Sequence, residues 1–273
     1  SVNTNVGAMI ALQNLNATNA QLEMTQSRIN TGKKVSSAKD NGAIWAIAQG
    51  QRADIGALGA VKQSLDRGVA AVDVALAAGE TVSDLLLQMK EKALAATDSS
   101  LKTAARSALN EDFKALRDQI ASVTSNAEFN GVNLLETGAS GFAALANVSG
   151  TSTLTVAAEV MALGSTNVSV STSQAIDTLS AATASLTAVN DSIDAVSGAL
   201  ARLGTSSKAL TTHNTFVGKL TDALEAGVGN LVDADLAKES AKLQALQTKQ
   251  QLGVQALGIA NQSPQLVLSL FRN

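Results

Sequence analysis

The sequence predicts a mainly α-helical protein: long antiparallel helical rods packed as a coiled-coil bundle, with paired N- and C-terminal helices and a small β-rich insertion at the distal end. Ala and Leu recur at helical spacing and aromatic residues make up only 2% of the chain, which favours long helices over a compact core of bulky side chains. Residues 1–22 and 250–271 contain no Asp, Glu, Lys or Arg. Between residues 136 and 175 the helical periodicity gives way to Gly, Ser, Thr, Val and Asn.

The two ends of the chain are predicted to be amphipathic helices whose polar faces lack charge. Such a helix suits a fully surrounded position rather than bulk water, because burying an unpaired charge is costly. We therefore expect residues 1–35 and 234–273 to pair and to pack against further copies of the chain. The predicted contact residues are Ala8, Leu12, Leu15, Leu22, Ile29, Leu252, Leu257, Ile259 and Leu266.

The first helix is defined by a heptad repeat. Ala8, Leu15, Leu22 and Ile29 are spaced seven residues apart, and Leu12 flanks them, as in a coiled-coil helix. The pattern breaks at residues 31–34, Thr-Gly-Lys-Lys, which have the composition of a turn.

Residues 36–135 and 176–233 are predicted to form the helical rods. Glycines at 56, 59, 68 and 79 interrupt the first of these stretches, and each costs up to ~1 kcal/mol relative to Ala in a helix. Helical periodicity continues to an Asn-Gly turn at 130–131, resumes near 176, and gives way to a final helix after residues 227–229, Gly-Val-Gly. The predicted rod-packing residues are Leu109, Phe113, Leu116, Ile120, Ile193, Val196 and Leu200.

Residues 136–175 are predicted to form the insertion. Residues 151–156 (TSTLTV) and 167–171 (NVSVS) alternate as short strands do. If the insertion faces solvent, its hydroxyl side chains are candidate sites for O-linked sugar, although Ser and Thr equally suit turns and strands. The candidates are Ser149, Thr151, Thr153, Ser165, Thr166 and Ser169.

The residue inventory argues against an enzyme. The chain has no Cys and a single His, so it lacks thiol nucleophiles, cysteine metal sites and the two-histidine metalloprotease motif. His213 falls on a helical seam, where we expect it to be packed or hydrogen-bonded. No phosphate-binding glycine loop is present, and we predict no catalytic residue, cofactor or metal.

The composition also limits the partners and the location of the protein. A net charge of −3 gives no basic surface for nucleic acid. The longest apolar run, residues 43–48, is too short to insert in a membrane. The sequence begins with no basic region followed by an apolar block, so we expect no cleavable signal peptide.

Three motifs, in order, resemble bacterial flagellins. Residues 29–43 (INTGKKVSSAKDNGA) resemble the N-terminal flagellin signature, residues 128–135 (EFNGVNLL) resemble its Phe-Asn-Gly turn, and residues 260–272 (ANQSPQLVLSLFR) resemble its C-terminal signature. Together with the helical organisation, the resemblance covers nearly the whole chain apart from the insertion.

The resemblance implies a structural subunit that polymerises into the extracellular flagellar filament, the helical propeller for swimming. In flagellins the paired terminal helices form an inner tube, the rods form an outer tube, and a variable domain points outward. The implied partners are further copies of the chain, a type III export apparatus that passes the chain unfolded to the growing tip, an export chaperone, and hook-junction and cap proteins.

One surface departs from the family pattern. Many flagellins read Leu-x-Arg-Met-Arg-Glu-Leu-Ala on a rod helix. Residues 86–93 here read LLQMKEKA, with Gln88 in place of the first Arg and Lys92 in place of Leu. In the family this surface contacts neighbouring subunits and is recognised by an animal Toll-like receptor, so Gln88, Lys90 and Glu91 are candidate contact residues. Two other interpretations stay open from the sequence: a hook–filament junction protein and a non-polymeric coiled-coil adaptor.

Overall fold

The computed structural model describes residues 4–270, with the side chains of residues 4–262. The described chain is mainly helical, which confirms the predicted fold class. Its helices are α1 (Val6–Thr31), α2 (Gly42–Ala96), α3 (Thr103–Asn126), α4 (Leu179–Val232) and α5 (Leu236–Leu270), and its strands are β1 (Glu128–Phe129), β2 (Val132–Asn133), β3 (Phe142–Leu145) and β4 (Thr153–Val156). The chain divides into two compact units, one formed by residues up to Ile55 and from Asp222 onward, the other by Gly56–Thr221.

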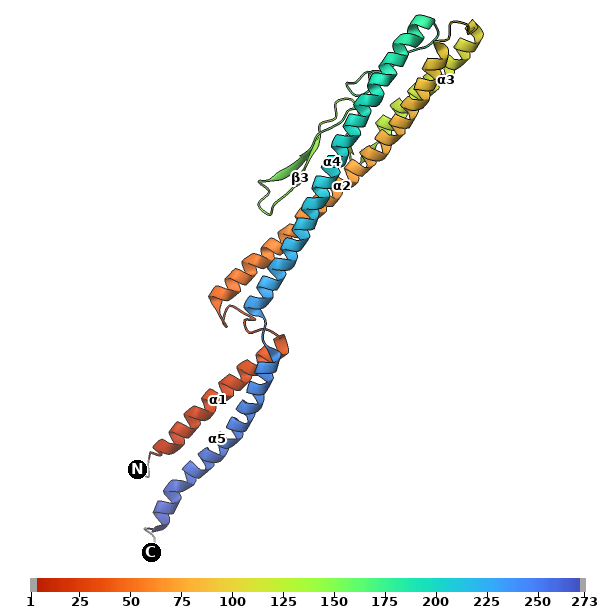
Figure 1. Cartoon of the computed structure of the whole chain (residues 1–273). Helices are drawn as coiled ribbons and strands as arrows, with labels where there is room; N and C mark the ends of the chain where they lie inside the picture. Colours follow the sequence, from red (N-terminus) through yellow and green to blue (C-terminus); the bar gives the residue numbers. More distant parts are fainter. Residues whose placement is uncertain (1–3, 271–273) are drawn as a thin grey trace. The chain divides into compact units, whose positions relative to one another are not determined.

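In the first unit, α1 and α5 lie side by side and antiparallel (Figure 1). The side chain of Asn5 caps α1 by accepting a hydrogen bond from the amide of Ala8 at 3.0 Å. α1 ends at Gly32, whose φ of 68° is a left-handed conformation that glycine adopts without strain. The break predicted at residues 31–34 is confirmed.

The segment between α1 and α2 is anchored to the end of α4. The amides of Lys34 and Val35 both donate to the carbonyl of Val232, at 2.8 and 3.3 Å. Val35 is buried there with Ala48, Val228 and Val232, and Trp45 packs against this cluster.

The last helix begins after residues 227–229, as predicted, at Leu236. α4 continues through both glycines to Val232, because Val228 and Val232 lie one turn apart and are both buried in the cluster. α5 starts after Asp235, whose side chain accepts hydrogen bonds from the amides of Ala237 and Lys238.

In the second unit, α2 and α4 run antiparallel, and α3 packs antiparallel to the end of α2 (Figure 1). Asp66 accepts a hydrogen bond from Asn214, and Gly79 lies against Leu200 further along. Lys92 forms an ion pair with Asp112 of α3 at 2.9 Å. The antiparallel rods predicted from the heptads are therefore present.

The described residues form two short antiparallel hairpins. β1 and β2 are joined by Asn130 and Gly131 with φ of 52° and 81°, which confirms the predicted Asn-Gly turn. β3 pairs with β4, with Phe142 opposite Val156. The strand predicted at 151–156 is present as β4, whereas its partner β3 was not predicted, since Phe-Ala-Ala-Leu has a helix-like composition.

The strand predicted at residues 167–171 is wrong, although the alternation is real. Val168 and Val170 are fully buried and Ser169 between them is exposed. The amide of Ser169 donates to the hydroxyl of Ser192 on α4, and the hydroxyl of Ser169 donates to the carbonyl of Ala188. Residues 167–171 therefore lie against α4. Their hydrogen bonds to α4 replace the bonds that a strand would form with a neighbouring strand.

The insertion lies along α2 and α4 of its unit (Figure 1). The amide of Leu145 donates to Ser64 of α2 at 3.1 Å. The ring of His213 on α4 bonds the carbonyl of Ala146 through Nε2 at 2.8 Å. The rods therefore support the insertion over much of its length.

Candidate assembly surfaces

Three polar contacts fix the alignment of α1 with α5. The Asn5 side chain donates to the carbonyl of Ala260 at 2.7 Å. Gln250 donates to Asn19 at 2.7 Å, and Arg28 pairs with Glu239 at 3.1 Å. Arg28 lies in the last turn of α1 and Glu239 in the first turn of α5, so each charge also interacts favourably with the dipole of its own helix.

The predicted terminal contact residues divide between two faces of this helix pair. Ala8, Leu15, Leu22, Ile29 and Leu257 are partly buried in the seam between α1 and α5. Leu12, Leu252 and Ile259 are exposed, with 47%, 60% and 71% of their surface accessible. The side chain of Leu266 lies outside the described residues.

The seam also contains residues that the heptad pattern of Ala8, Leu15, Leu22 and Ile29 did not predict. Thr18 and Thr25 are buried at 3% and 0% exposure, and with Ala11 they form a second seven-residue series between the predicted positions. Gly253 faces Leu15 so closely that a β-carbon there would lie 3.2 Å from its Cδ1 atom. The seven-residue spacing of Ala11, Thr18 and Thr25 could have predicted this series. It was not recognised because two of its three residues are Thr and not apolar.

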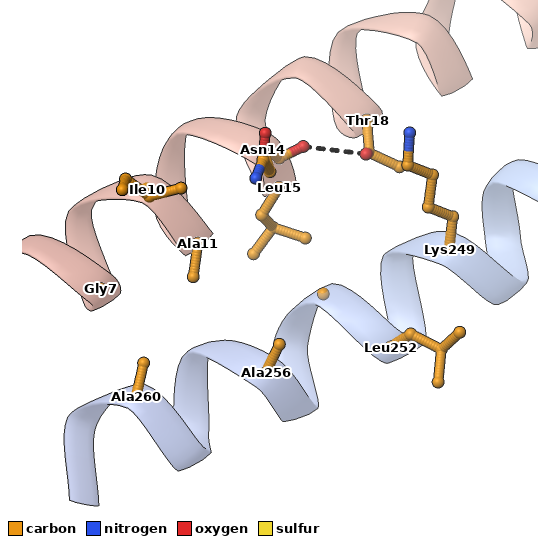
Figure 2. Close-up of a pocket in the computed structure, with 11 residues that line it drawn as sticks. Gly7, Ile10, Ala11, Asn14, Leu15, Thr18, Lys249, Leu252, Ala256 and Ala260 are labelled. Atoms are coloured by element: carbon orange, nitrogen blue, oxygen red, sulfur yellow. Dashed lines mark hydrogen bonds between the residues drawn. The ribbon is translucent and has the colours of Figure 1, made fainter. Parts of the chain in front are cut away.

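A shallow groove of about 460 Å³ lies where α1 and α5 meet. Ala11 and Leu15 of α1 point towards α5, and Ala256 and Ala260 point back towards α1 (Figure 2). Small side chains thus leave the groove open, and the exposed Leu252 lies at its edge. Val6, Met9 and Ile10 are further large apolar side chains that are exposed on α1.

The loop of the N-terminal signature is organised around Asp40. One oxygen of its carboxylate accepts from the hydroxyl and amide of Ser36, both at 2.9 Å, and from the amide and hydroxyl of Ser37, at 2.9 and 3.3 Å. These hydrogen bonds, that of the Ser36 hydroxyl first, lower the pKa of Asp40 below its ordinary value. The Ser-Ser-x-x-Asp pattern therefore encodes a loop that is closed by side-chain bonds.

The predicted rod residues all lie in the interior of the second unit. Phe113, Ile120 and Val196 are fully buried. Leu109, Leu116, Ile193 and Leu200 are partly buried.

Polar residues that the apolar periodicity did not predict also lie in this rod core. Asn110 is buried and accepts a hydrogen bond from the amide of Ile176 at 2.7 Å. Ser185 is buried and donates to the carbonyl of Ala175 at 2.8 Å. Both side chains attach the segment before α4 to the rods.

The candidate contact residues Gln88, Lys90 and Glu91 are exposed on α2. Leu87 and Leu94 are exposed on the same stretch of helix. This surface thus combines apolar and charged side chains.

The candidate hydroxyls of the insertion differ in their hydrogen bonding. Ser165 is partly buried and bonds the carbonyl of Val160, and Ser169 is bonded to α4 as described above. Ser149 and Thr151 bond one another at 2.8 Å. Thr153 and Thr166 are exposed.

A bidentate ion pair also fixes the insertion to α4. Arg202 donates to both carboxylate oxygens of Glu159, at 2.7 and 2.6 Å. The hydrogen bond to Glu159 raises the pKa of Arg202 above its ordinary value. Two parallel charge-assisted bonds fix orientation as well as distance.

The single histidine of the chain makes local contacts within its unit. His213 bonds a backbone carbonyl and lies 5.7 Å from the ring of Phe216. Residues 4–270 bring together no group of His, Cys, Asp and Glu that could hold a metal ion. Over the same range, no helix is long and apolar enough to cross a membrane.

Known proteins match the chain over nearly its whole length. Residues 2–139 match the bacterial flagellin N-terminal helical region, and residues 186–271 match the bacterial flagellin C-terminal helical region. Flagellin FljM and flagellin FljK of Caulobacter vibrioides are 58% and 57% identical, over 100% of this chain and 98% of each relative. A solved structure of a putative flagellar hook-associated protein from Vibrio parahaemolyticus shares the fold, with a TM-score of 0.59 at 15% identity over 71% of this chain and 100% of the other.

Proposed function

Because this chain belongs to the bacterial flagellin family, we propose how its parts divide the work of building a flagellar filament. The protein is a structural subunit of that extracellular filament and not an enzyme, and its family assembles by self-association. The open questions are which surfaces of this chain join the subunits and which other proteins handle it.

The α1–α5 pair is proposed to form the inner tube. The single observation that carries this proposal is the apolar exposed face of the pair, where Leu252 and Ile259 are 60% and 71% exposed. Large apolar side chains grouped on one surface mark an interaction site. A second copy fits this surface because its own pair presents the same uncharged face.

The two faces of the pair are proposed to do different jobs. The seam residues Ala8, Leu15, Leu22, Ile29 and Leu257 hold α1 to α5 within a chain. Leu12, Leu252, Ile259 and, by its place in the same repeat, Leu266 contact other copies. Short helices are marginal alone in water, so packing between copies stabilises the pair further.

The rods, residues 36–135 and 176–233, are proposed to form the outer tube. Their packing residues stabilise one subunit internally, whereas Gln88, Lys90 and Glu91 lie on a surface available to neighbours. The insertion, residues 136–175, is then the outermost part. Exposed Thr153 and Thr166 are the best-placed candidates there for O-linked sugar, followed by Ser149 and Thr151, whereas Ser165 and Ser169 have bonded hydroxyls.

The resemblance also supports a route to the filament. We propose that the chain is exported unfolded by the type III apparatus and assembled at the distal tip under a cap protein, with hook-junction proteins below it. An export chaperone would cover apolar surfaces such as that around Ile259 before assembly.

The experiment compares Ile259→Asp with the matched control Ile259→Leu. Purified full-length protein is mixed with short filament seeds and examined by negative-stain electron microscopy. Wild-type protein and Ile259→Leu are expected to form long filaments. Ile259→Asp is expected to remain soluble and helical but unpolymerised, because it would bury an unpaired charge. Normal filaments from Ile259→Asp would show that this face is not a contact between copies.

A further inference from the structure

The four methionines of the chain form two pairs that differ in exposure. Met89 and Met161 are fully buried in the second unit, whereas Met9 and Met24 on α1 are 63% and 52% exposed. A thioether reacts only with an oxidant that reaches its sulfur atom. The exposed pair is therefore open to oxidants in solution, and the buried pair is shielded.

Met9 and Met24 both point away from α5. Met9 lies nine residues, or about two and a half turns, before Thr18, which is buried in the seam between α1 and α5. Met24 lies the same number of residues after Leu15, which is partly buried in that seam. A separation of two and a half turns places two side chains on opposite faces of a helix. The two thioethers therefore lie on the outward face of α1.

Large apolar side chains surround Met9 on this face. Met9 lines a shallow depression together with Val6, Ile10 and Leu12, and all three of these neighbours are exposed. Leu12 is one of the residues proposed above to contact another copy. Met is unbranched and flexible, so it fits irregular apolar contacts of this kind. Oxidation of Met9 would therefore add a polar group within an apolar surface.

The sequence supplies few competing targets for a peroxide. The chain has no Cys and a single Trp, and Trp45 packs against the buried cluster around Val35. Thiols, the side chains that are oxidised in a stepwise ladder by peroxides, are thus missing. The exposed thioethers are the reactive side chains that remain.

We propose that Met9 and Met24 are oxidation sites of the unpolymerised chain, and that their sulfoxides block polymerisation until a thiol-dependent reductase removes the oxygen. Each sulfur loses two electrons to hydrogen peroxide: the O–O bond breaks, an S–O bond forms, and the second oxygen leaves with both hydrogen atoms as water. In the reverse step two thiols supply two electrons and form a disulfide, and the sulfoxide oxygen leaves as water.

The effect on assembly follows from the polarity of the sulfoxide. Oxidation converts a flexible apolar side chain into a polar one, and burying its oxygen among apolar side chains without a hydrogen-bond donor is costly. This effect rests on the proposed function, since it requires the outward face of α1 to meet another copy. In a filament that contact covers Met9 and Met24, so oxidation acts mainly on subunits that have not yet assembled.

The first experiment measures where oxygen is added. Folded, unpolymerised full-length protein is treated with hydrogen peroxide, and peptide mass spectrometry follows each methionine. Met9 and Met24 are expected to react at least ~10-fold faster than Met89 and Met161, which react only when the second unit opens locally. Equal rates at all four would overturn the assignment. In filaments Met9 and Met24 should react more slowly than in the unpolymerised protein, and equal rates in the two states would overturn their burial on assembly.

The second experiment compares Met9→Leu/Met24→Leu with the matched control Met89→Leu/Met161→Leu. Leu has a volume close to that of Met and costs little stability, but it has no sulfur. After peroxide treatment and removal of the oxidant, each protein is added to filament seeds and sedimented. Wild type and the control are expected to lose ~10-fold or more of the sedimenting fraction, whereas Met9→Leu/Met24→Leu keeps it. An equal loss in that variant would overturn the role of the two sulfoxides.

Reduction provides the last measurement. Treated wild-type protein is incubated with a thiol and two methionine sulfoxide reductases, one for each sulfoxide epimer, and polymerisation is expected to return. Continued loss after both sulfoxides are gone would place the damage elsewhere and overturn the proposed block. Untreated wild type and the Ile259→Asp comparison test the proposed function separately. Treated wild type that carries both sulfoxides yet polymerises normally would overturn only the effect of oxidation.

Discussion

A β-carbon at Gly141 would overlap the carbonyl oxygen of Val156, because the two backbones approach within contact distance where β3 begins. Phe142, the next residue, is paired with Val156 in the hairpin. The close approach involves backbone atoms, which cannot move aside as the end of a flexible side chain can. Gly141 is therefore required for the β3–β4 hairpin to close.

Gly141→Ala is expected to lower the free energy of unfolding of the second unit by ~1–3 kcal/mol, the usual cost of overpacking. The measurement is urea unfolding followed by circular dichroism, with wild-type protein as reference. An unchanged midpoint would mean that the hairpin is not closed in solution.

Gly59→Ala is expected to have the opposite effect. No atom lies within 4 Å of a β-carbon built at Gly59, and Ala is favoured over Gly in a helix by ~1 kcal/mol. The same unfolding experiment should show a gain of about that size. At Gly79 a β-carbon would lie 2.7 Å from the end of Leu200, so Gly79→Ala should gain less than Gly59→Ala. Equal gains at both glycines would contradict the packing described for α2.

Thr25→Val is expected to stabilise the α1–α5 pair. The hydroxyl of Thr25 is buried with no hydrogen-bond partner among the described residues, and replacing such a group by a methyl of similar shape gains ~1 kcal/mol or more. Hydrogen exchange of α1 amides should slow by about fivefold for each kcal/mol. Thr18→Val is the matched control: the Thr18 hydroxyl donates to the carbonyl of Asn14 at 2.9 Å, so its loss should give less protection.

Asp40→Asn is expected to weaken the signature loop at neutral pH but not in strong acid. The folded-state pKa of Asp40 is lowered, so its charged form stabilises the fold above the ordinary pKa of an Asp carboxyl, and this contribution is lost as pH falls through the lower, folded-state pKa. Trp45, the only tryptophan, packs on the neighbouring cluster, and its fluorescence can report urea unfolding. The difference between wild type and Asp40→Asn should be clear near pH ~7 and should disappear once the pH lies well below the ordinary pKa of an Asp carboxyl. A difference that persists unchanged in acid would exclude the carboxylate as its source.

The sequence predicted those parts of the fold that local patterns determine. The heptad spacing of apolar residues predicted the rods. The Asn130–Gly131 dipeptide predicted a turn, because Asn and Gly are the residue types that most readily adopt a positive φ. β3 escaped prediction because Phe142–Leu145 has no strand pattern of its own and depends on its pairing with β4. Residues 167–171 show a strand pattern without a strand partner, since α4 supplies their hydrogen bonds.

The candidate surfaces were predictable only in part. The heptad spacing predicted Leu12 as a residue beside the seam between α1 and α5. Neighbouring residues of a helix, however, point in directions about 100° apart. That rotation separates the exposed Leu12 from the partly buried Ala11. The position of the β3–β4 turn beside α4 was not visible from the sequence, because it depends on the hydrogen bond between the ring of His213 and the carbonyl of Ala146, 67 residues away.

The hydrogen bond between Asn5 and Ala260 joins residues that are 255 positions apart. A ribosome adds about 5–20 residues per second, so α1 exists for roughly 10–50 s before residue 260 is made. During that interval α2, α3 and both hairpins have already been synthesised, whereas the apolar seam of α1 has no α5 to cover it. The pairing of α1 with α5 can therefore form only after the rest of the described chain has been synthesised, although α1 is the first helix to be made.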